Sequence, residues 1–352
     1  MENQLTINMD LTKEAALARL KSLLVVQSAS TDEKKMRRYV RRIMKLIDPA
    51  MVYTMDAHGN LFFTKGNAEL YPTVVSHLDT VHKIEDEARV FEYEEKLYCY
   101  NPLTGKQIGT GGDDKVGIFI ALEMALELPA IKCAFFSREE IGCKGSGEAN
   151  LAFFENSAFV IQADRKGNTD LIRTAIGTEL FSSEFSAAIA PIAKKFGYKE
   201  TSGGSTDVVE LKKRGVNICV FNASCGYHNP HKPSEWCDIE QVFNTLDFFR
   251  DVCINMATKR WVHVYTKPVT HTYNSTHTRH SAYQPNTATH GPSALPWSGD
   301  SKHTPFPDDK FSWGRGLSTT VDDMMDDWRV MTEYFPIEIE DVNEKEIPFH
   351  LY

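Results

Sequence analysis

The sequence lacks the features that mark several large classes of protein. Its seven cysteines are odd in number and include no CxxC pair, so we expect reduced, mostly buried thiols rather than a disulfide framework. No apolar run approaches the ~20 residues of a membrane helix, which argues against a membrane partner. The first residues show no basic-then-apolar signal pattern, and the expected location is therefore cytoplasmic.

An excess of positive charge is also missing. The formal net charge of the 352 residues is -9, whereas a nucleic-acid partner requires a basic face that binds phosphate. An acidic protein is suited instead to cations, either metal ions or the free ammonium end of a peptide. One predicted helix does carry a basic outer face, which we interpret as solvated. Its basic residues are Lys34, Lys35, Arg37, Arg38, Arg41 and Arg42.

Helix and strand patterns alternate along most of the chain, and apolar residues make up 42% of it, enough for a sizeable core. Helical spacing of apolar residues predicts helices over 12–26, 32–47, 114–128, 178–196 and 239–259, with Thr12 and Asp238 as N-caps. Short apolar runs predict strands at 51–55, 61–64, 73–76, 91–93, 96–100, 131–137, 159–163 and 217–222. This alternation is typical of an α/β protein.

The composition changes after Trp261. Residues 263–309 are rich in Thr, His, Ser, Pro and Asn and contain too few apolar side chains to offset chain entropy. An acidic stretch at 321–327 and an aromatic and acidic ending at 334–352 follow. We therefore predict a folded domain over residues 1–262 and an extended, low-complexity and acidic tail over residues 263–352.

Acidic and histidine residues stand beside several of the predicted core elements. They are His77 and Asp79, Asp113 and Asp114, Glu139 and Glu140, Asp164, and His228 with His231. Carboxylates and imidazoles are ligands of zinc, manganese and cobalt, and two ions ~3.5–4 Å apart need about five such side chains. Open α/β sheets place their active sites at the carboxyl ends of strands. We predict that these groups meet in a two-metal hydrolase site.

Each motif has an ordinary structural explanation when it is taken alone. Asp113 or Asp114 can cap the helix that follows the glycines at 109–112. The Glu139-Glu140 pair can belong to a solvent-exposed loop, and Asp164 can be a cap or a member of an ion pair. The functional interpretation rests on their common order and on their positions at the ends of strands.

The same residue types also fit a division of chemical roles. His77 and Asp79 point to the same side of a strand end, so His77 can bind a metal while Asp79 accepts its other N–H. In the adjacent pair, one of Glu139 and Glu140 can bind metal while the other takes a proton from bound water.

This ordered set resembles the co-catalytic di-zinc exopeptidase superfamily, which includes peptidase T-like, glutamyl aminopeptidase-like and leucyl aminopeptidase-like enzymes. The most specific blocks are Glu-Glu-Ile-Gly at 139–142 and Gly-x-Asp-Asp-Lys at 111–115. Residues 202–207 are similar to the Gly-rich Thr-Asp loop of those families. The residues alone do not separate His228 from His231, but the His-x-x-x-Glu pattern of the superfamily favours His231.

The resemblance implies two divalent metal ions, zinc in the first place with cobalt or manganese as alternatives. The implied metal ligands are His77, Asp113, Glu140, Asp164 and His231. Asp113 would bridge the two ions, and its peptide bond to Asp114 is expected to be cis. Glu139 would act as general base and then as acid, and Asp79 would orient His77.

The resemblance also implies a fold and an activity. The fold would be a three-layer α/β/α sandwich with a mixed, mostly parallel central sheet. Because only 35 residues separate His77 from Asp113 and 66 separate Asp164 from His231, no inserted lid domain is expected. Residues 1–262 would form a metallo-exopeptidase, an aminopeptidase or a di/tripeptidase for short peptides, with a possible homo-oligomer. The alternatives are an N-acyl amino acid deacylase on the same site and a non-catalytic metal-binding scaffold.

Overall fold

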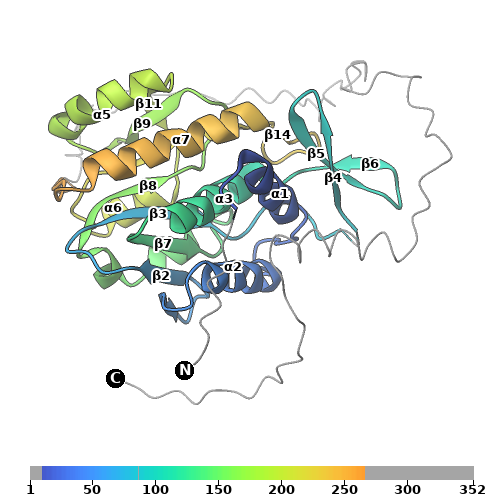
Figure 1. The fold of residues 1–352 in the computed structure, drawn as a ribbon, viewed down its shortest axis with the longest axis horizontal. Coiled ribbons are helices and arrows are strands. Elements are labelled where there is room, and N and C mark those ends of the chain that lie inside the picture. Colours follow the sequence, from blue (N-terminus) through green and yellow to red (C-terminus); the bar gives the residue numbers. More distant parts are fainter. Residues whose placement is uncertain (1–9, 86, 266–352) are drawn as a thin grey trace, which may run out of the picture. The chain divides into compact units, whose positions relative to one another are not determined.

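Nine strands form a mixed sheet at the centre of the protein, whose computed structural model describes residues 10–85 and 87–265 (Figure 1). They are β1 (Val52–Met55), β2 (Leu61–Lys65), β3 (Tyr71–His77), β7 (Ile131–Phe136), β8 (Ser157–Gln162), β9 (Asp170–Ala175), β10 (Thr178–Glu179), β11 (Lys199–Gly203) and β12 (Val220–Ala223). The order is β1-β2-β7-β3-β8-β12-β9-β10, and β11 pairs with β9. Strands β7, β3, β8 and β12 are parallel, so their carboxyl ends lie at one edge.

The central strands are buried on both faces. Every residue of β3, β7 and β8 is buried, which is the pattern of a parallel sheet covered by helices on each side. On one face α3 (Gly112–Glu127) packs against β3 and β7 and contacts α1 (Lys13–Leu24), α2 (Lys34–Ile47) and α7 (Ile239–Met256), while α5 (Ser183–Lys195) packs on α7. On the other face α6 (Asp207–Lys213) packs against β3, β8 and β12 and contacts α4 (Lys144–Glu148) (Figure 1). The predicted three-layer α/β/α sandwich is thereby confirmed.

Four of the five predicted helices begin within two residues of the predicted position, among the seven α-helices in the described part of the chain. The seven are α1 (Lys13–Leu24), α2 (Lys34–Ile47), α3 (Gly112–Glu127), α4 (Lys144–Glu148), α5 (Ser183–Lys195), α6 (Asp207–Lys213) and α7 (Ile239–Met256), with a 3-10 turn, η1, at Leu151–Phe154. Thr12 caps α1 by accepting a hydrogen bond from the backbone N–H of Ala15. Asp238 caps α7 in the same way through Gln241, so both predicted caps are confirmed.

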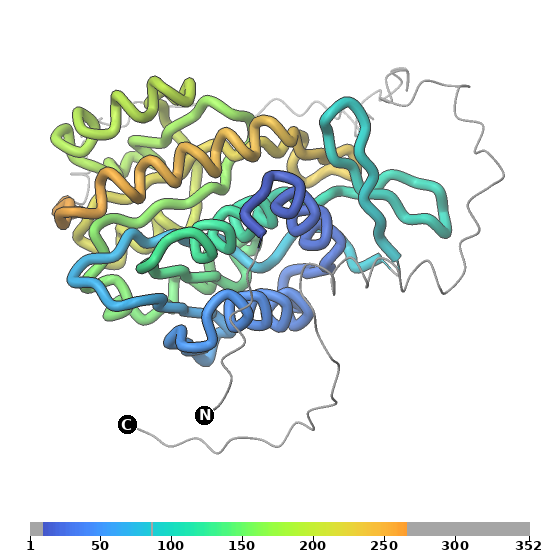
Figure 2. The backbone as a smooth tube through the Cα atoms, in the orientation of Figure 1, coloured from blue at the N-terminus to red at the C-terminus, as the bar shows by residue number. Residues whose placement is uncertain are grey.

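A second, antiparallel sheet stands beside the central one. Its strands are β4 (Arg89–Tyr93), β5 (Lys96–Asn101), β6 (Lys106–Ile108), β13 (Tyr227–His228) and β14 (Trp236–Asp238). Figure 2 shows how β4 to β6, which follow β3, meet β13 and β14, which precede α7. This sheet therefore brings two segments that are far apart in the sequence to one place.

One predicted helix starts too early. The sequence pattern predicts a helix over 178–196, but Thr178 begins β10, which pairs with β9 in a tight hairpin. The two turn residues, Ile176 and Gly177, both have positive φ, as a two-residue hairpin turn requires. The helix α5 begins only after Ser182, whose hydroxyl accepts a hydrogen bond from the backbone N–H of Phe185. The prediction also omitted β6, β9, β11, β13, β14, α4 and α6.

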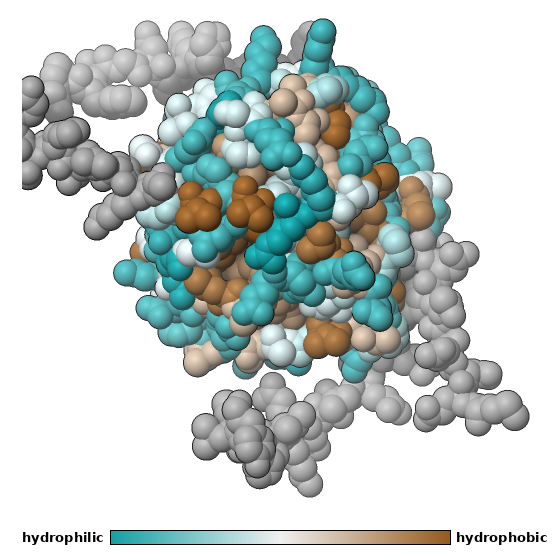
Figure 3. Space-filling model, turned by 90° about the vertical axis from the view of Figure 1, so that its left-hand side faces the viewer, coloured by the Kyte–Doolittle hydropathy of each residue, from teal (hydrophilic) through white to brown (hydrophobic). Residues whose placement is uncertain are grey.

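The surface of the described part is polar with scattered apolar groups. Figure 3 shows one face, on which hydrophobic residues form small separate patches between hydrophilic ones, as is normal for protein surfaces in water. None of the described helices has the length and apolar character needed to cross a bilayer.

All seven cysteines are buried and unpaired, which confirms the expected free thiols. The predicted tail lies almost wholly outside the described residues, so its boundary at 262 stays a prediction.

A buried ion pair ties the first helix to α3. The Arg19 guanidinium donates two hydrogen bonds of 2.6 Å to the Glu123 carboxylate, and the two side chains are only 7% and 3% exposed. We expect Arg19→Met to lower the free energy of unfolding by about 3–5 kcal/mol, because an unpaired charge stays buried. Urea denaturation measures this change.

The matched control is on the same helix. Lys21 pairs with Glu92 at the surface, where the two side chains are 36% and 39% exposed. Lys21→Met is expected to change stability by less than about 1 kcal/mol. Equal losses of stability from the two substitutions would show that the buried Arg19–Glu123 pair contributes no more to the free energy of unfolding than the exposed pair does.

Candidate metal centre

Three adjacent parallel strands deliver acidic and histidine side chains to one edge of the central sheet. His77 is the last residue of β3, and Glu139 and Glu140 follow β7, its neighbour on one side. Asp164 follows β8, its neighbour on the other side. Because parallel strands end together, these four residues meet at the edge where α/β sheets hold their ligands.

Asp113 comes from the start of α3. The helix begins after Gly111, whose φ of 64° lies in the left-handed region that glycine tolerates best. The Asp113–Asp114 peptide bond is cis, as the resemblance implied. Asp114 rather than Asp113 bonds to nearby backbone: its carboxylate accepts hydrogen bonds from the N–H groups of Gly117 and His77. Asp113 therefore does not act as the helix cap, and its side chain faces the strand ends.

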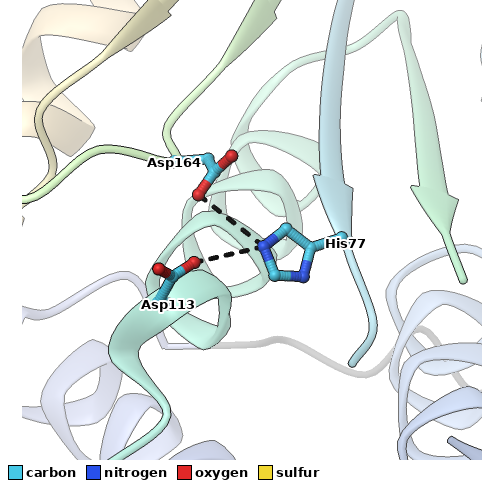
Figure 4. A group of neighbouring side chains, drawn as sticks. All are labelled: His77, Asp113 and Asp164. Carbon is cyan, nitrogen blue, oxygen red and sulfur yellow. Dashed lines mark hydrogen bonds and ion pairs between the residues drawn. The ribbon is translucent and has the colours of Figure 1, made fainter. Parts of the chain in front are cut away.

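The first group of side chains surrounds the imidazole of His77. Its Nε2 lies 3.2 Å from Asp113 Oδ1 and 3.6 Å from Asp164 Oδ1 (Figure 4). One ligand atom from each residue lies within 4.8 Å of the others, a spacing that suits a shared metal ion. All three side chains are at least largely buried: His77 is fully buried, Asp164 is 8% exposed and Asp113 is 12% exposed.

The second group shares Asp113 with the first. His231 Nε2 lies 3.2 Å from Asp113 Oδ2 and 3.1 Å from Glu140 Oε2. The ligand atoms of these three residues also lie within 4.8 Å of one another. Asp113 thus directs one carboxylate oxygen to each group. His228 lies elsewhere: it stacks on Trp236 and pairs with Gln241.

An orphaned oxygen shows that these residues fit a metal. Glu140 Oε1 is buried and has no hydrogen-bond partner among the described residues. A buried carboxylate oxygen without a partner is costly, and a divalent cation would satisfy it. The donor set of carboxylates and imidazoles is also the one that zinc, cobalt and manganese prefer. The five residues therefore fit the predicted metal pair.

The protonation of the cluster is strongly perturbed. Burial raises the pKa of Glu139 to about 9 and that of Glu140 to about 8. Burial and the charge of Asp113 raise the pKa of Asp164 to about 6. Burial opposes the charged form of His77, but hydrogen bonds to carboxylates outweigh it and raise its pKa. The charge of bound cations would favour the deprotonated acids and the neutral imidazoles.

Asp79 connects the first strand end with the loop after β7. Its carboxylate accepts hydrogen bonds from the backbone N–H groups of Glu139 and Glu140, at 2.8 and 3.3 Å, and from the Ser30 hydroxyl at 2.7 Å. The Nδ1 of His77 lies 2.9 Å from the backbone carbonyl of Asp79 and 3.5 Å from its carboxylate. Asp79 therefore contacts His77 mainly through its backbone, while its carboxylate holds the Glu139-Glu140 segment.

A buried glutamate beside the cluster holds the backbone that carries Asp113. Glu235 is fully buried and accepts hydrogen bonds from the N–H groups of Gly111 and Asp113. It also lies 2.6 Å from His82 Nε2. The His-x-x-x-Glu pattern pointed to Glu235, but nothing in the sequence singled out His82, because its partner lies 153 positions away.

A second set of polar groups holds Asp164. The Thr206 hydroxyl donates to Asp164 Oδ2 at 2.8 Å, and the side chain of Asn222 bonds to both the N–H and the C=O of Asp164. Thr206 belongs to the Gly-rich loop that the sequence analysis noted. Asn222 ends a predicted strand and carried no signal of its own, because an asparagine at a strand end is common.

The α/β/α fold and the two groups of acidic and histidine side chains that share Asp113 are those expected of a metallo-exopeptidase. Residues 73–255, just over half of the chain, match Peptidase family M20/M25/M40, and the chain belongs to that family. The predicted superfamily, fold class and enzyme class are confirmed. No curated protein matches the sequence significantly.

Solved structures of peptidases have the same fold. Aminopeptidase PepT from Bacillus cereus is 13% identical, with a TM-score of 0.58 over 70% of this chain and 99% of that one. A tripeptidase from Staphylococcus aureus is also 13% identical, with a TM-score of 0.55 over 69% of this chain and 99% of that one. An aminopeptidase from the archaeon Desulfurococcus kamchatkensis is 14% identical, with a TM-score of 0.53 over 70% and 96% of the two chains.

Proposed function

We propose that this protein is an aminopeptidase or a di/tripeptidase that hydrolyses short peptides with two divalent metal ions, zinc in the first place. The observation that carries the proposal is the sharing of Asp113, whose two oxygens face two separate groups of ligands. A carboxylate in that position would be able to hold both ions of a metal pair. The expected homo-oligomer stays a prediction.

The residues divide into two metal-holding groups. One ion would be held by His77, Asp113 and Asp164, and the other by Asp113, Glu140 and His231. When bound, such ions acidify a water molecule toward a pKa of ~7 and polarise the scissile carbonyl. The hydrogen bonds that Glu235 accepts from the N–H groups of Gly111 and Asp113 hold the backbone that carries the shared carboxylate.

Glu139 is the proposed proton carrier. It follows β7, lies next to Glu140 and belongs to neither ligand group. Its backbone N–H is fixed by Asp79, and its Oε1 accepts a hydrogen bond of 3.2 Å from the Cys143 thiol. The side chain is thereby held at the cluster while it stays free to take a proton from water and return it to the leaving amine.

The acidic character of the site favours substrates with a free amino terminus. Carboxylates of Asp113, Glu139, Glu140, Asp164 and the buried Asp207 lie in or beside the cluster. A substrate ammonium group would find an acceptor there. A blocked amine offers no positive charge, so a deacylase would gain nothing from this arrangement.

A matched substrate pair tests this preference. The chain should first be stripped of metal with a chelator and then reloaded with zinc, cobalt or manganese. We expect the metal-free protein to be inactive. We expect the reloaded protein to cleave a free aminoacyl-anilide roughly 10- to 100-fold better in kcat/KM than its N-acetyl form, the value of one charge-assisted hydrogen bond.

The opposite result identifies the alternatives. Faster cleavage of the N-acetylated substrate would replace the aminopeptidase with an N-acyl amino acid deacylase. Stoichiometric metal binding without cleavage of either substrate would favour the scaffold interpretation.

A further inference from the structure

One described cavity lies outside the proposed metal centre, between α2 and strands β1 and β2 of the central sheet. It is a groove of about 650 Å³. Four cationic side chains line one wall, and two aromatic rings contribute to its floor. These residues are Arg38, Arg41, Arg42 and Lys45, with Tyr53 and Phe63 below them.

The cations of this groove are not neutralised within the described part of the chain. Arg38, Arg41, Arg42 and Lys45 are all exposed, and no salt bridge to them is formed by residues 10–85 or 87–265. The Arg41 guanidinium lies over the Tyr53 ring, 5.1 Å from its centroid. Asp48 is the one acidic residue among the lining side chains. An anionic occupant would therefore gain several favourable contacts.

A buried polar atom at the floor also lacks a partner. The Tyr53 hydroxyl is shielded from solvent and makes no hydrogen bond among the described residues. Buried hydroxyls are normally paired, so this one points to a polar group that completes the groove.

An open strand edge borders the same groove. Strand β1 is the last strand on its side of the sheet and pairs only with β2 within the described residues. Val52 and Met55 at its two ends are 66% and 51% exposed. Proteins normally cover or pair such an edge, because its free N–H and C=O groups invite another strand.

The chain carries a segment that complements both features. Residues 337–342 read Ile-Glu-Ile-Glu-Asp-Val, in which residues 337–340 alternate apolar and acidic side chains, so that a strand here would carry Glu338 and Glu340 on one face. The surrounding residues 333–346 hold six acidic side chains and one lysine, a net charge of -5. Pro336 directly before the segment is compatible with an edge strand.

We propose that residues 337–342 of the same chain add to the open edge of β1, with their acidic face on the four cations of the groove. Main-chain hydrogen bonds to β1 would supply affinity, and the charge pairs would fix which face of the segment meets α2. The 69 residues that separate Tyr265 from Phe335 can span up to roughly 230 Å, so chain length does not prevent this contact. The inference stands independently of the proposed peptidase activity.

Amide hydrogen exchange of the full-length protein tests the proposal. We expect the amides of residues 337–342 to exchange at least ~10-fold more slowly than those of an unstructured peptide, and those of β1 to be protected as well. Protection should not depend on protein concentration, because the segment belongs to the same chain. Loss of protection on dilution would assign the groove to a second copy and overturn the proposal.

Charge reversal isolates the contact. Arg38→Glu with Arg42→Glu should remove the protection of residues 337–342, and Glu338→Lys with Glu340→Lys should do the same. The combination of all four substitutions should restore it, as a double-mutant cycle requires of a direct pairing. The matched control is Lys34→Glu with Lys35→Glu, on the same helix but outside the groove lining, which should leave protection unchanged.

Two further outcomes would overturn the proposal. One is rapid exchange of residues 337–342 in the unmodified protein. The other is protection that none of the reversals alters. Circular dichroism of each variant checks that the exposed substitutions leave the fold intact, so a lost signal cannot be attributed to unfolding.

Discussion

Glu139→Gln is expected to lower kcat for peptide hydrolysis by roughly 10²- to 10⁴-fold, the range for loss of a general acid–base group. Glutamine keeps the shape of the side chain and can still accept the hydrogen bond from Cys143. It cannot take a proton from water or return one to the leaving amine. KM is expected to change little, because Glu139 belongs to neither ligand group.

Metal content separates a chemical role of Glu139 from a structural one. The variant should bind the same number of metal ions as the unmodified protein, measured by elemental analysis after dialysis. Glu148→Gln is the matched control, since Glu148 is an exposed acid on α4, shortly after the same loop. Full activity in Glu139→Gln would exclude this residue as the base.

Asp113→Asn is expected to reduce the bound metal from two ions per chain to at most one and to abolish hydrolysis. The two carboxylate oxygens face different groups, at 3.2 Å from His77 and 3.2 Å from His231. An amide presents one acceptor oxygen and an NH₂ group that cannot bind a cation. One of the two ligand groups therefore loses the carboxylate oxygen that Asp113 contributes to it.

A distant aspartate supplies the control for charge alone. Asp32→Asn removes an exposed carboxylate near the start of α2 and should leave both ions and the activity in place. Retention of two ions by Asp113→Asn would contradict the shared-ligand arrangement and with it the proposed function.

The sequence predicted the architecture well where local patterns are strong. Long amphipathic helices with clear caps, such as α1 and α7, and fully apolar strands, such as β3, begin within a few residues of their predicted positions. Strand β9 was missed because its residues are only partly buried and mix charged with apolar side chains. Strand β10 is two residues long and forms only by pairing with β9, so no local sequence pattern can predict it.

The sequence predicted the residues of the candidate site better than the contacts that their side chains make. Order and residue type predicted which segments meet, and the resemblance to the exopeptidase superfamily selected the five side chains, including His231 rather than His228. Order and residue type were not sufficient to show that Asp114 bonds to the backbone and leaves Asp113 free, because that division depends on the turn before α3. They also did not reveal that the carboxylate of Asp79 holds the Glu139-Glu140 segment, since this contact joins residues 60 positions apart.

The placement of three site segments on neighbouring strands makes the metal centre sensitive to sheet alignment. A slip of β3 by one residue against β7 and β8 would turn His77 to the opposite face, because successive side chains of a strand alternate. A core substitution that loosens this alignment would therefore lower the activity even though it changes none of the proposed metal ligands. Screens of this enzyme for lost activity should therefore recover interior valines of β3 alongside the acidic residues at its end.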